Sequence, residues 1–194
     1  MKNVIAQLLA VIILNVFYAN VKANDFVKDQ ALTRKPRAVK SEYIGFKSAK
    51  INGKIPFLTK TNLLFNLIGK PDRLSKPDLN EYCGSFYNKV FKLASVKGVD
   101  AEIYGDTAVV RSINFKKSPD FSLATRLINL NHNTTLADLK KVFPNAVKSS
   151  VLLNDVDMGK TVAVHIAIEK ELEDSWLLLF QNGKLVRIDY YRPC

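Results

Sequence analysis

The stretch SWLLLFQNGKLVRIDYY (175–191) decides the fold, because it contains two β-rich runs joined by Asn182-Gly183. Asn and Gly both tolerate the positive φ of a type I′ turn, so this stretch predicts a β-hairpin. Just before it, TVAVHIAIE (161–169) alternates apolar side chains with small or polar ones. Such alternation is typical of a strand with one buried face. The C-terminal part of the chain therefore predicts an antiparallel meander.

A strand and a helix are predicted before this meander. TRLINLNHN (125–133) is predicted as a short strand, and TTLADLKKVFP (134–144) places its apolar residues on one helical stripe. Thr135 can cap this helix together with Asp138, and Pro144 is expected to end it. The second half of the chain thus has the order strand, helix, strand, hairpin.

The first half predicts the same order of elements. They are a strand at 49–54, a helix from Thr59, a strand at 89–96 and a hairpin at 101–115. Its hairpin turn at Gly105 precedes Asn182 by almost the same spacing as Thr59 precedes Thr135. This recurrence favours duplication of one unit, although an unrelated α+β protein could share such a spacing by coincidence.

The fold class predicted from these elements is α+β. We expect two strand-helix-meander repeats, at 46–118 and 119–194, forming one compact unit with an antiparallel sheet. Two short amphipathic helices can cover only one face of such a sheet, so the other face is expected to be open. An open face is a surface free to bind a partner.

The helix of the first half ends in a Gly-x-Pro step at Gly69 and Pro71, with Phe143-Pro144 as a degenerate counterpart. In this the chain resembles the tandem-repeat fold of the β-lactamase inhibitor protein and of the small outer-membrane assembly lipoproteins related to it. The resemblance covers about residues 46–194. It implies an exported, non-enzymatic protein that binds other proteins with a concave sheet face. The lipid-modified Cys of the lipoproteins has no counterpart here, and no single binding residue is implied.

The first residues have the layout of an export signal. In MKNVIAQLLAVIILNVFYANVKA (1–23), Lys2 is followed by an apolar run, and Val21 and Ala23 place small side chains before a cleavage site. The prediction is a signal peptide cleaved after Ala23 and a periplasmic or secreted protein. A membrane anchor is the alternative, but the run is shorter than the roughly 20 residues that span a bilayer. No transmembrane span is expected after cleavage.

Residues 24–45 are predicted to form a basic N-terminal arm. The chain has a formal net charge of +11, and much of the excess lies in KDQALTRKPRAVK (28–40). Its candidate binding residues are Arg34, Lys35, Arg37 and Lys40. Charge runs of this kind are usually solvated, and the alternative is contact with an anionic partner.

The chain contains two cysteines, Cys83 and Cys194. An exported protein is exposed to oxidising conditions, in which these residues could form a disulfide. Spacing alone leaves the bridge and the free thiols both open.

Motifs that carry catalysis or bind cofactors are missing from the sequence. Neither His132 nor His165 has a second His or a Cys at ligand spacing, so no metal site is expected. No nucleophile elbow and no Gly-rich phosphate loop is present, so neither an enzyme nor a cofactor is expected. The high charge alone does not indicate nucleic-acid binding, because no recognition module accompanies it.

The open face is expected to carry five candidate binding residues. They are His165, Trp176, Arg187, Asp189 and Tyr191. On the last strand, Leu185 is assigned to the same face as Arg187, and Val186 to the buried face with Ile188 and Tyr190, because side chains alternate along a strand. Tyr, Trp and Arg often anchor protein interfaces. A solvated sheet face with ordinary cross-strand Arg–Asp pairing is the alternative.

The sequence thus favours an exported, non-enzymatic binding protein. Its partner is expected to be a protein or a cell-envelope component, and the oligomeric state is left open. One alternative is a small hydrolase or ligand-binding protein of the cystatin-like kind, with a pocket near His165, and another is a purely structural envelope protein.

Overall fold

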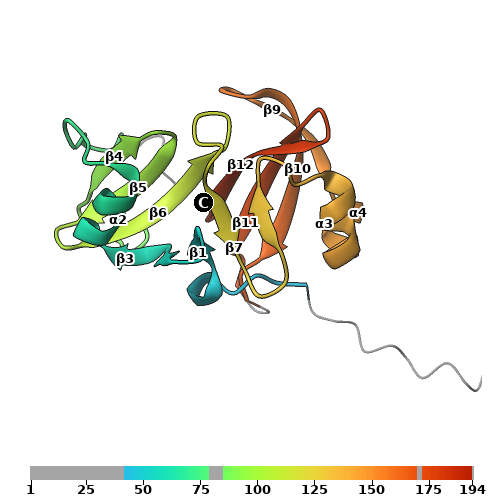
Figure 1. Cartoon of the computed structure of the whole chain (residues 1–194), viewed down its shortest axis with the longest axis horizontal. Helices are drawn as coiled ribbons and strands as arrows, with labels where there is room; N and C mark the ends of the chain where they lie inside the picture. The colour runs from blue at the N-terminus through green and yellow to red at the C-terminus, as the bar shows by residue number, and fades with distance from the viewer. Residues whose placement is uncertain (1–41, 79–84, 170–171, 194) are drawn as a thin grey trace, which may run out of the picture. The chain divides into compact units, whose positions relative to one another are not determined.

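The computed structural model describes residues 42–78, 85–169 and 172–193, which belong to one compact unit that begins at Ser41. This unit is mostly β, with a few short helices (Figure 1). It contains two antiparallel sheets, one of four and one of eight strands, and neither closes into a barrel. The expected antiparallel sheet is therefore present, together with a second, smaller one that the sequence did not reveal.

The larger sheet is built from two meanders. Its strands run in the order β4, β5, β6, β12, β11, β10 and β9, and β3 adds a further pairing to β6. The bounds are β3 Leu58–Lys60, β4 Lys92–Val96, β5 Val99–Tyr104, β6 Thr107–Asn114, β9 Val151–Asp155, β10 Gly159–Ala167, β11 Ser175–Gln181 and β12 Lys184–Tyr191. From the outside of the sheet towards its centre, the first meander has the order β4-β5-β6 and the second has the order β10-β11-β12.

The two meanders meet along β6 and β12. Only three residue pairs join these strands, namely Ser112 with Asp189, Ile113 with Ile188 and Asn114 with Arg187. The two strands pair antiparallel, and each is the last strand of its meander. The last strands of the two meanders therefore form the centre of the sheet.

The smaller sheet joins residues from both halves of the chain. It comprises β1 Lys50–Ile51, β2 Ile55–Pro56, β7 Ser122–Ala124 and β8 Asn129–Asn131, in the order β2-β1-β7-β8. Asn52 and Gly53 both have positive φ and turn the chain between β1 and β2. The strand expected over 49–54 is thus two short strands of a tight hairpin.

Three short α-helices lie in the described part of the chain, α2 Thr61–Ile68, α3 Leu136–Val142 and α4 Pro144–Lys148, with one 3₁₀ turn at Phe46–Ser48. Thr135 and Asp138 form the predicted capping box at the start of α3. Pro144 does not end the helical region as expected but opens α4, because proline suits the first helical position. The Glu42 carboxylate accepts hydrogen bonds from the backbone N–H groups of Asn145 (3.1 Å) and Ala146 (2.9 Å) in α4.

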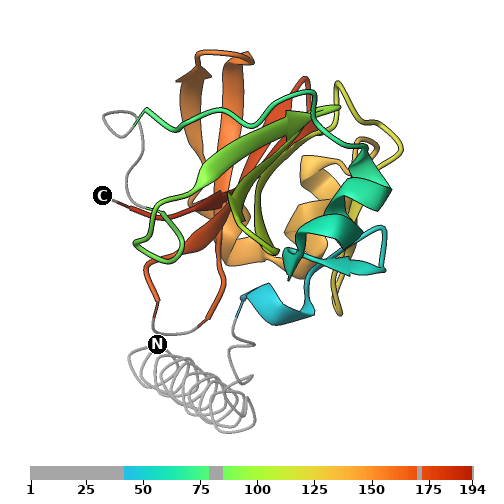
Figure 2. The same ribbon diagram turned by 90° about the vertical axis from the view of Figure 1, so that its left-hand side faces the viewer.

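The main core lies between the helices, the smaller sheet and one face of the larger sheet (Figure 2). Helix residues such as Leu64 and Leu139 and the small-sheet residue Leu123 belong to it, together with Val110 and Ile166 of the larger sheet. We call this side of the larger sheet the covered face. The alternation expected over 161–169 is confirmed there, because Val164, Ile166 and Ile168 are all buried in this core.

Aromatic side chains fill the middle of the main core. Trp176 stacks on Phe46 with ring centroids 5.7 Å apart, and Phe57 meets the Trp176 ring edge-on at 4.7 Å. The Trp176 indole N–H donates to the Ile44 carbonyl at 2.7 Å. The segment that precedes β1 is therefore fixed onto β11 of the second meander.

The predicted hairpins are confirmed. β11 and β12 turn at Asn182 and Gly183, whose φ angles of 51° and 76° fit the type I′ turn. In the first meander, β5 and β6 turn at Gly105, with φ of 66°. Strand β9 was not predicted, and its Val-Leu-Leu run carries no alternation that would mark one buried face.

Candidate functional site

The other side of the larger sheet carries Arg187, and we call it the Arg187 face. The register of the sheet aligns one residue from each of six neighbouring strands, His165, Leu177, Asp189, Ser112, Asp100 and Ser95. Directly paired residues point to the same side of a sheet. A row of mainly polar side chains therefore crosses this face, from the second meander into the first.

A β-bulge in β12 decides which side chains reach the Arg187 face. Leu179 pairs with Arg187 and Phe180 pairs with Leu185, so Val186 is the extra residue. Leu185 is consequently in the main core, while Val186 packs with Leu179 on the Arg187 face. The faces expected for Leu185 and Val186 were therefore wrong, because strict alternation does not continue through a bulge. Ile188 and Tyr190 are in the core as expected.

Arg187 is held by three carboxylates. Its Nε atom lies 2.7 Å from Asp189, and its Nη1 atom lies 3.4 Å from Asp157 and 4.0 Å from Asp155. Asp155 also accepts the backbone N–H groups of Asp157 and Met158, at 2.9 and 2.8 Å. The turn between β9 and β10 is thus fixed beside Arg187.

Burial raises the pKa of Asp189 to about 6, although Arg187 acts in the opposite direction. Asp155 and Asp100 raise it further, because their negative charges disfavour a third one nearby. Asp100 in turn accepts a hydrogen bond from the Ser112 hydroxyl at 2.7 Å. The carboxylates around Arg187 are therefore in excess of the positive charge that faces them.

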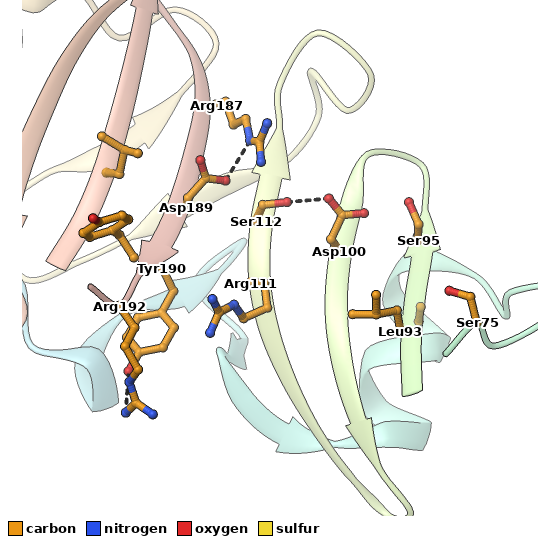
Figure 3. A pocket seen from close by; sticks show the side chains of 13 residues that line it. Ser75, Leu93, Ser95, Asp100, Arg111, Ser112, Arg187, Asp189, Tyr190 and Arg192 are labelled. Atoms are coloured by element: carbon orange, nitrogen blue, oxygen red, sulfur yellow. Dashed lines mark hydrogen bonds and ion pairs between the residues drawn. The ribbon is translucent and has the colours of Figure 1, made fainter. Parts of the chain in front are cut away.

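A pocket of about 370 Å³ lies on this face, and Figure 3 shows its lining. Its side chains come from both meanders, with Asp100 and Ser112 from the first and Arg187, Asp189 and Tyr191 from the second. A concave site with a few fixed polar groups is the usual form of a ligand pocket. Ser112, Arg187 and Asp189 of the β6–β12 pairing line the pocket, so the pocket lies where the two meanders meet.

His165 lies outside the lining of this pocket and is exposed. Its Nδ1 atom lies 2.9 Å from the Ser175 hydroxyl, and the Tyr191 ring meets its imidazole edge-on with centroids 5.2 Å apart. Partial burial of the ring lowers the pKa of His165 below its ordinary value. Among the described residues, no carboxylate forms a hydrogen bond with His165.

Trp176 is not on the Arg187 face, and its assignment there was wrong. The side chain is 0% exposed and belongs to the main core. It pairs with Ile166, whose side chain also points to the covered face. The structure therefore brings together Arg187, Asp189 and Tyr191 at the pocket, places His165 beside Tyr191, and separates Trp176 from all of them.

A buried ion pair adjoins the pocket and was not predicted. Arg111 Nη1 lies 3.3 Å from Glu102, which is fully buried and also accepts the Phe86 backbone N–H at 2.9 Å. The Arg111 guanidinium lies over the Tyr190 ring, 5.2 Å from its centroid. Asp100 pairs with Ser112 and Ala101 pairs with Val110, so Arg111 is the extra residue of a bulge in β6.

The sequence carried a signal for these missed residues. Glu102, Arg111 and Ser112 interrupt the apolar runs of a predicted hairpin, and a polar residue within such a run needs a partner when it is buried. Asp100 directly precedes the hairpin predicted at 101–115 and could have been placed beside Ser112 once the register was known. The bulge, which shifts this register by one residue, has no clear signal in the sequence.

Several predicted sites lie outside the described residues. They are the signal peptide at 1–23, the basic residues Arg34, Lys35, Arg37 and Lys40, and the cysteines Cys83 and Cys194. Within the described ranges, no group of three or more His, Cys, Asp or Glu side chains could hold a metal ion. In that same part of the chain, no helix has both the length and the apolar character needed to cross a membrane.

Comparison with known proteins gives no relative: no protein-family model, no curated protein and no solved structure matches this chain.

Proposed function

We propose that this protein is an exported, non-enzymatic binding protein that contacts a protein or cell-envelope component through the Arg187 face. The observation that carries the proposal is the pocket on that face, which Arg187 and Tyr191 border. Tyr and Arg are among the residue types that dominate binding energy at protein interfaces. The export signal predicted for residues 1–23 supports a location where envelope components are accessible.

The ion pairs of Arg187 support this proposal. Because Asp189 and Asp157 hold the guanidinium, the side chain is already ordered before a partner arrives. An ordered side chain loses less conformational entropy on binding than a mobile one. Tyr191 lines the same pocket as Arg187, and His165 meets the Tyr191 ring edge-on; both side chains are exposed.

We also propose that the fold is a duplicated strand-helix-meander unit with one open sheet face, similar to that of the β-lactamase inhibitor protein. The reversed order of the two meanders about the β6–β12 pairing supports duplication. The smaller number of buried apolar residues on the Arg187 face than on the covered face supports the open face. The repeat boundaries at 46–118 and 119–194 stay predictions.

The test compares affinity capture from the native cell envelope by three forms of the protein. One is the wild type, one carries His165→Ala with Tyr191→Ala, and the control carries Leu63→Ala with Lys140→Glu. The first pair of changes alters the Arg187 face without removing the ion pairs of Arg187. The control changes exposed residues of α2 and α3.

We expect the variant of the Arg187 face to lose at least about tenfold in captured partner, the effect of about 1.4 kcal/mol, and the control to lose nothing. Thermal unfolding followed by circular dichroism establishes that all three forms are folded. Equal capture by all three forms would remove this face as the binding surface.

A hydrolase is the second candidate function, and the contact of His165 with Ser175 favours it. A serine hydroxyl beside an imidazole is the arrangement of an activated nucleophile. Against it, the Ser175 residue is only 7% exposed. Incubation with a fluorophosphonate followed by peptide mass spectrometry decides the question, because a covalent adduct on Ser175 would contradict the non-enzymatic proposal.

A further inference from the structure

Strand β9 forms one outer edge of the larger sheet and exposes apolar side chains at residues 151–153. Leu152 is 86% exposed, and Val151 and Leu153 are exposed as well. The strand pairs with β10 on one side, from Val151 opposite Ala163 to Asp155 opposite Gly159. Within the described residues, no other backbone pairs with its second side.

The opposite edge of the same sheet, at β4, is covered. Ser75 forms two backbone hydrogen bonds with Leu93, of 3.0 and 2.8 Å, so the segment before β4 occupies its outer side. β4 also begins with Lys92, a residue type that discourages pairing between edges. β9 has the sequence Val-Leu-Leu-Asn-Asp, without Lys, Pro or a bulge. An apolar edge of this kind is a ready template for another strand.

We infer that β9 is a self-association site, at which two copies of this chain pair their β9 strands antiparallel about a two-fold axis. Such an interface is closed, because each copy presents the same strand to the other. It extends the eight-stranded sheet of each copy into the next, and it brings the exposed leucines of both copies into contact.

The charges that flank β9 select a second copy in this orientation. Lys148 precedes the strand and Asp157 follows it, and both residues are exposed, although Asp157 also lies 3.4 Å from Arg187 of its own chain. Antiparallel pairing centred near Leu153 brings the Lys148 end of one copy to the Asp157 end of the other. Parallel pairing would instead place like charges together. The self-complementary ends therefore fit a second copy.

Sedimentation equilibrium of the purified protein over a range of concentrations tests this inference. We expect a monomer–dimer equilibrium that Leu152→Lys weakens by at least about tenfold, because a charge then lies in the apolar contact. The matched control is Leu63→Lys on α2, where the wild-type leucine is also exposed, at 44%. This control is expected to dimerise like the wild type.

The orientation is tested by mixing two charge-reversal variants. Lys148→Glu alone and Asp157→Lys alone each place like charges at both ends of the two-fold contact, so each dimerises more weakly than the wild type. Mixed together, they form a heterodimer in which both ends are again opposite in sign. Recovery of dimer on mixing is therefore the expected result.

Two outcomes would overturn the inference. One is a monomer at every concentration up to about 1 mM, which leaves less than about 4 kcal/mol for association. The other is a dimer that Leu152→Lys does not weaken, which would locate the interface elsewhere. Because the His165 and Tyr191 variant leaves β9 intact and Leu152→Lys leaves the ion pairs of Arg187 intact, these two variants separate loss of partner capture from loss of dimerisation.

Discussion

The two meanders of the larger sheet share an order of strands but differ in what they contribute. The first, β4 to β6, turns tightly at Lys97 and Gly98, both at positive φ, and its edge is covered by Ser75. The second, β10 to β12, carries Trp176 in the main core and acquires the additional edge strand β9. The two meanders thus have a similar topology but contribute differently to the core and to the edges of the sheet.

The difference extends to the treatment of charge. In the first meander, Glu102 is fully buried and meets Arg111. In the second, Arg187 lies near the surface among carboxylates and borders the pocket. A buried ion pair specifies local structure at a high desolvation cost, whereas a partly exposed one can still meet a ligand. The second meander is therefore the better candidate for binding, because its arginine is partly exposed at the pocket.

Truncating Trp176 should cause the largest loss in the free energy of unfolding, and it tests whether the second meander contributes more to the main core than the first. Trp176→Ala removes the largest buried side chain and its hydrogen bond to Ile44, so we expect a loss of about 3–5 kcal/mol in the free energy of unfolding. Val99→Ala, at the corresponding place in β5, should cost about 2 kcal/mol. Urea unfolding followed by circular dichroism gives both values. Equal losses would show that the two meanders share the core evenly.

The turn glycines provide the next largest contrast. A Cβ at Gly98 would lie 2.7 Å from Lys117 Cβ and 3.0 Å from the Asn114 carbonyl, whereas one at Gly183 meets nothing within 4 Å. Both residues have positive φ, which costs a non-glycine residue about 1–2 kcal/mol. We expect Gly98→Ala to cost about 2–4 kcal/mol and Gly183→Ala about 1 kcal/mol, since only the former adds a steric clash. Thermal melts that rank them in the reverse order would contradict the tight packing of the first turn.

Titration of Asp189 tests whether carboxylates are in excess around Arg187. Its pKa is raised from 3.8 to about 6 in the folded protein, so the folded state binds the proton more tightly than the unfolded state. This contribution to stability is complete below about pH 4 and is lost as the pH rises through 6, to a total of at most about 3 kcal/mol. Asp189→Asn should remove that decline, while Asp157→Asn keeps it. Parallel pH profiles for the wild type and Asp189→Asn, from urea unfolding between pH 4 and 7, would refute the raised pKa.

Much of the second meander could be predicted from sequence because its signals are local. Asn182-Gly183 fixes a turn through backbone preference, and the alternation before it assigns His165 and Ile166 to opposite faces. The capping box of Thr135 is local as well. Each of these features depends on residues a few positions apart.

The rest depends on contacts between distant residues. The bulge at Val186 reverses the assignment of Leu185, and it arises from pairing with β11 and not from the sequence of β12 alone. Trp176 was placed on the wrong face because aromatic side chains are common both in protein interfaces and in hydrophobic cores. The pocket needs the pairing of β6 with β12, which no short motif encodes.

The anchoring of the earliest described residues has a consequence for the timing of folding. Glu42 is bound by Asn145 and Ala146, and Ile44 by Trp176, each more than a hundred positions later in the chain. During synthesis these residues leave the ribosome long before their partners exist. The unit can be completed only after synthesis has passed Trp176, and contacts over such separations favour slow maturation over folding in step with translation.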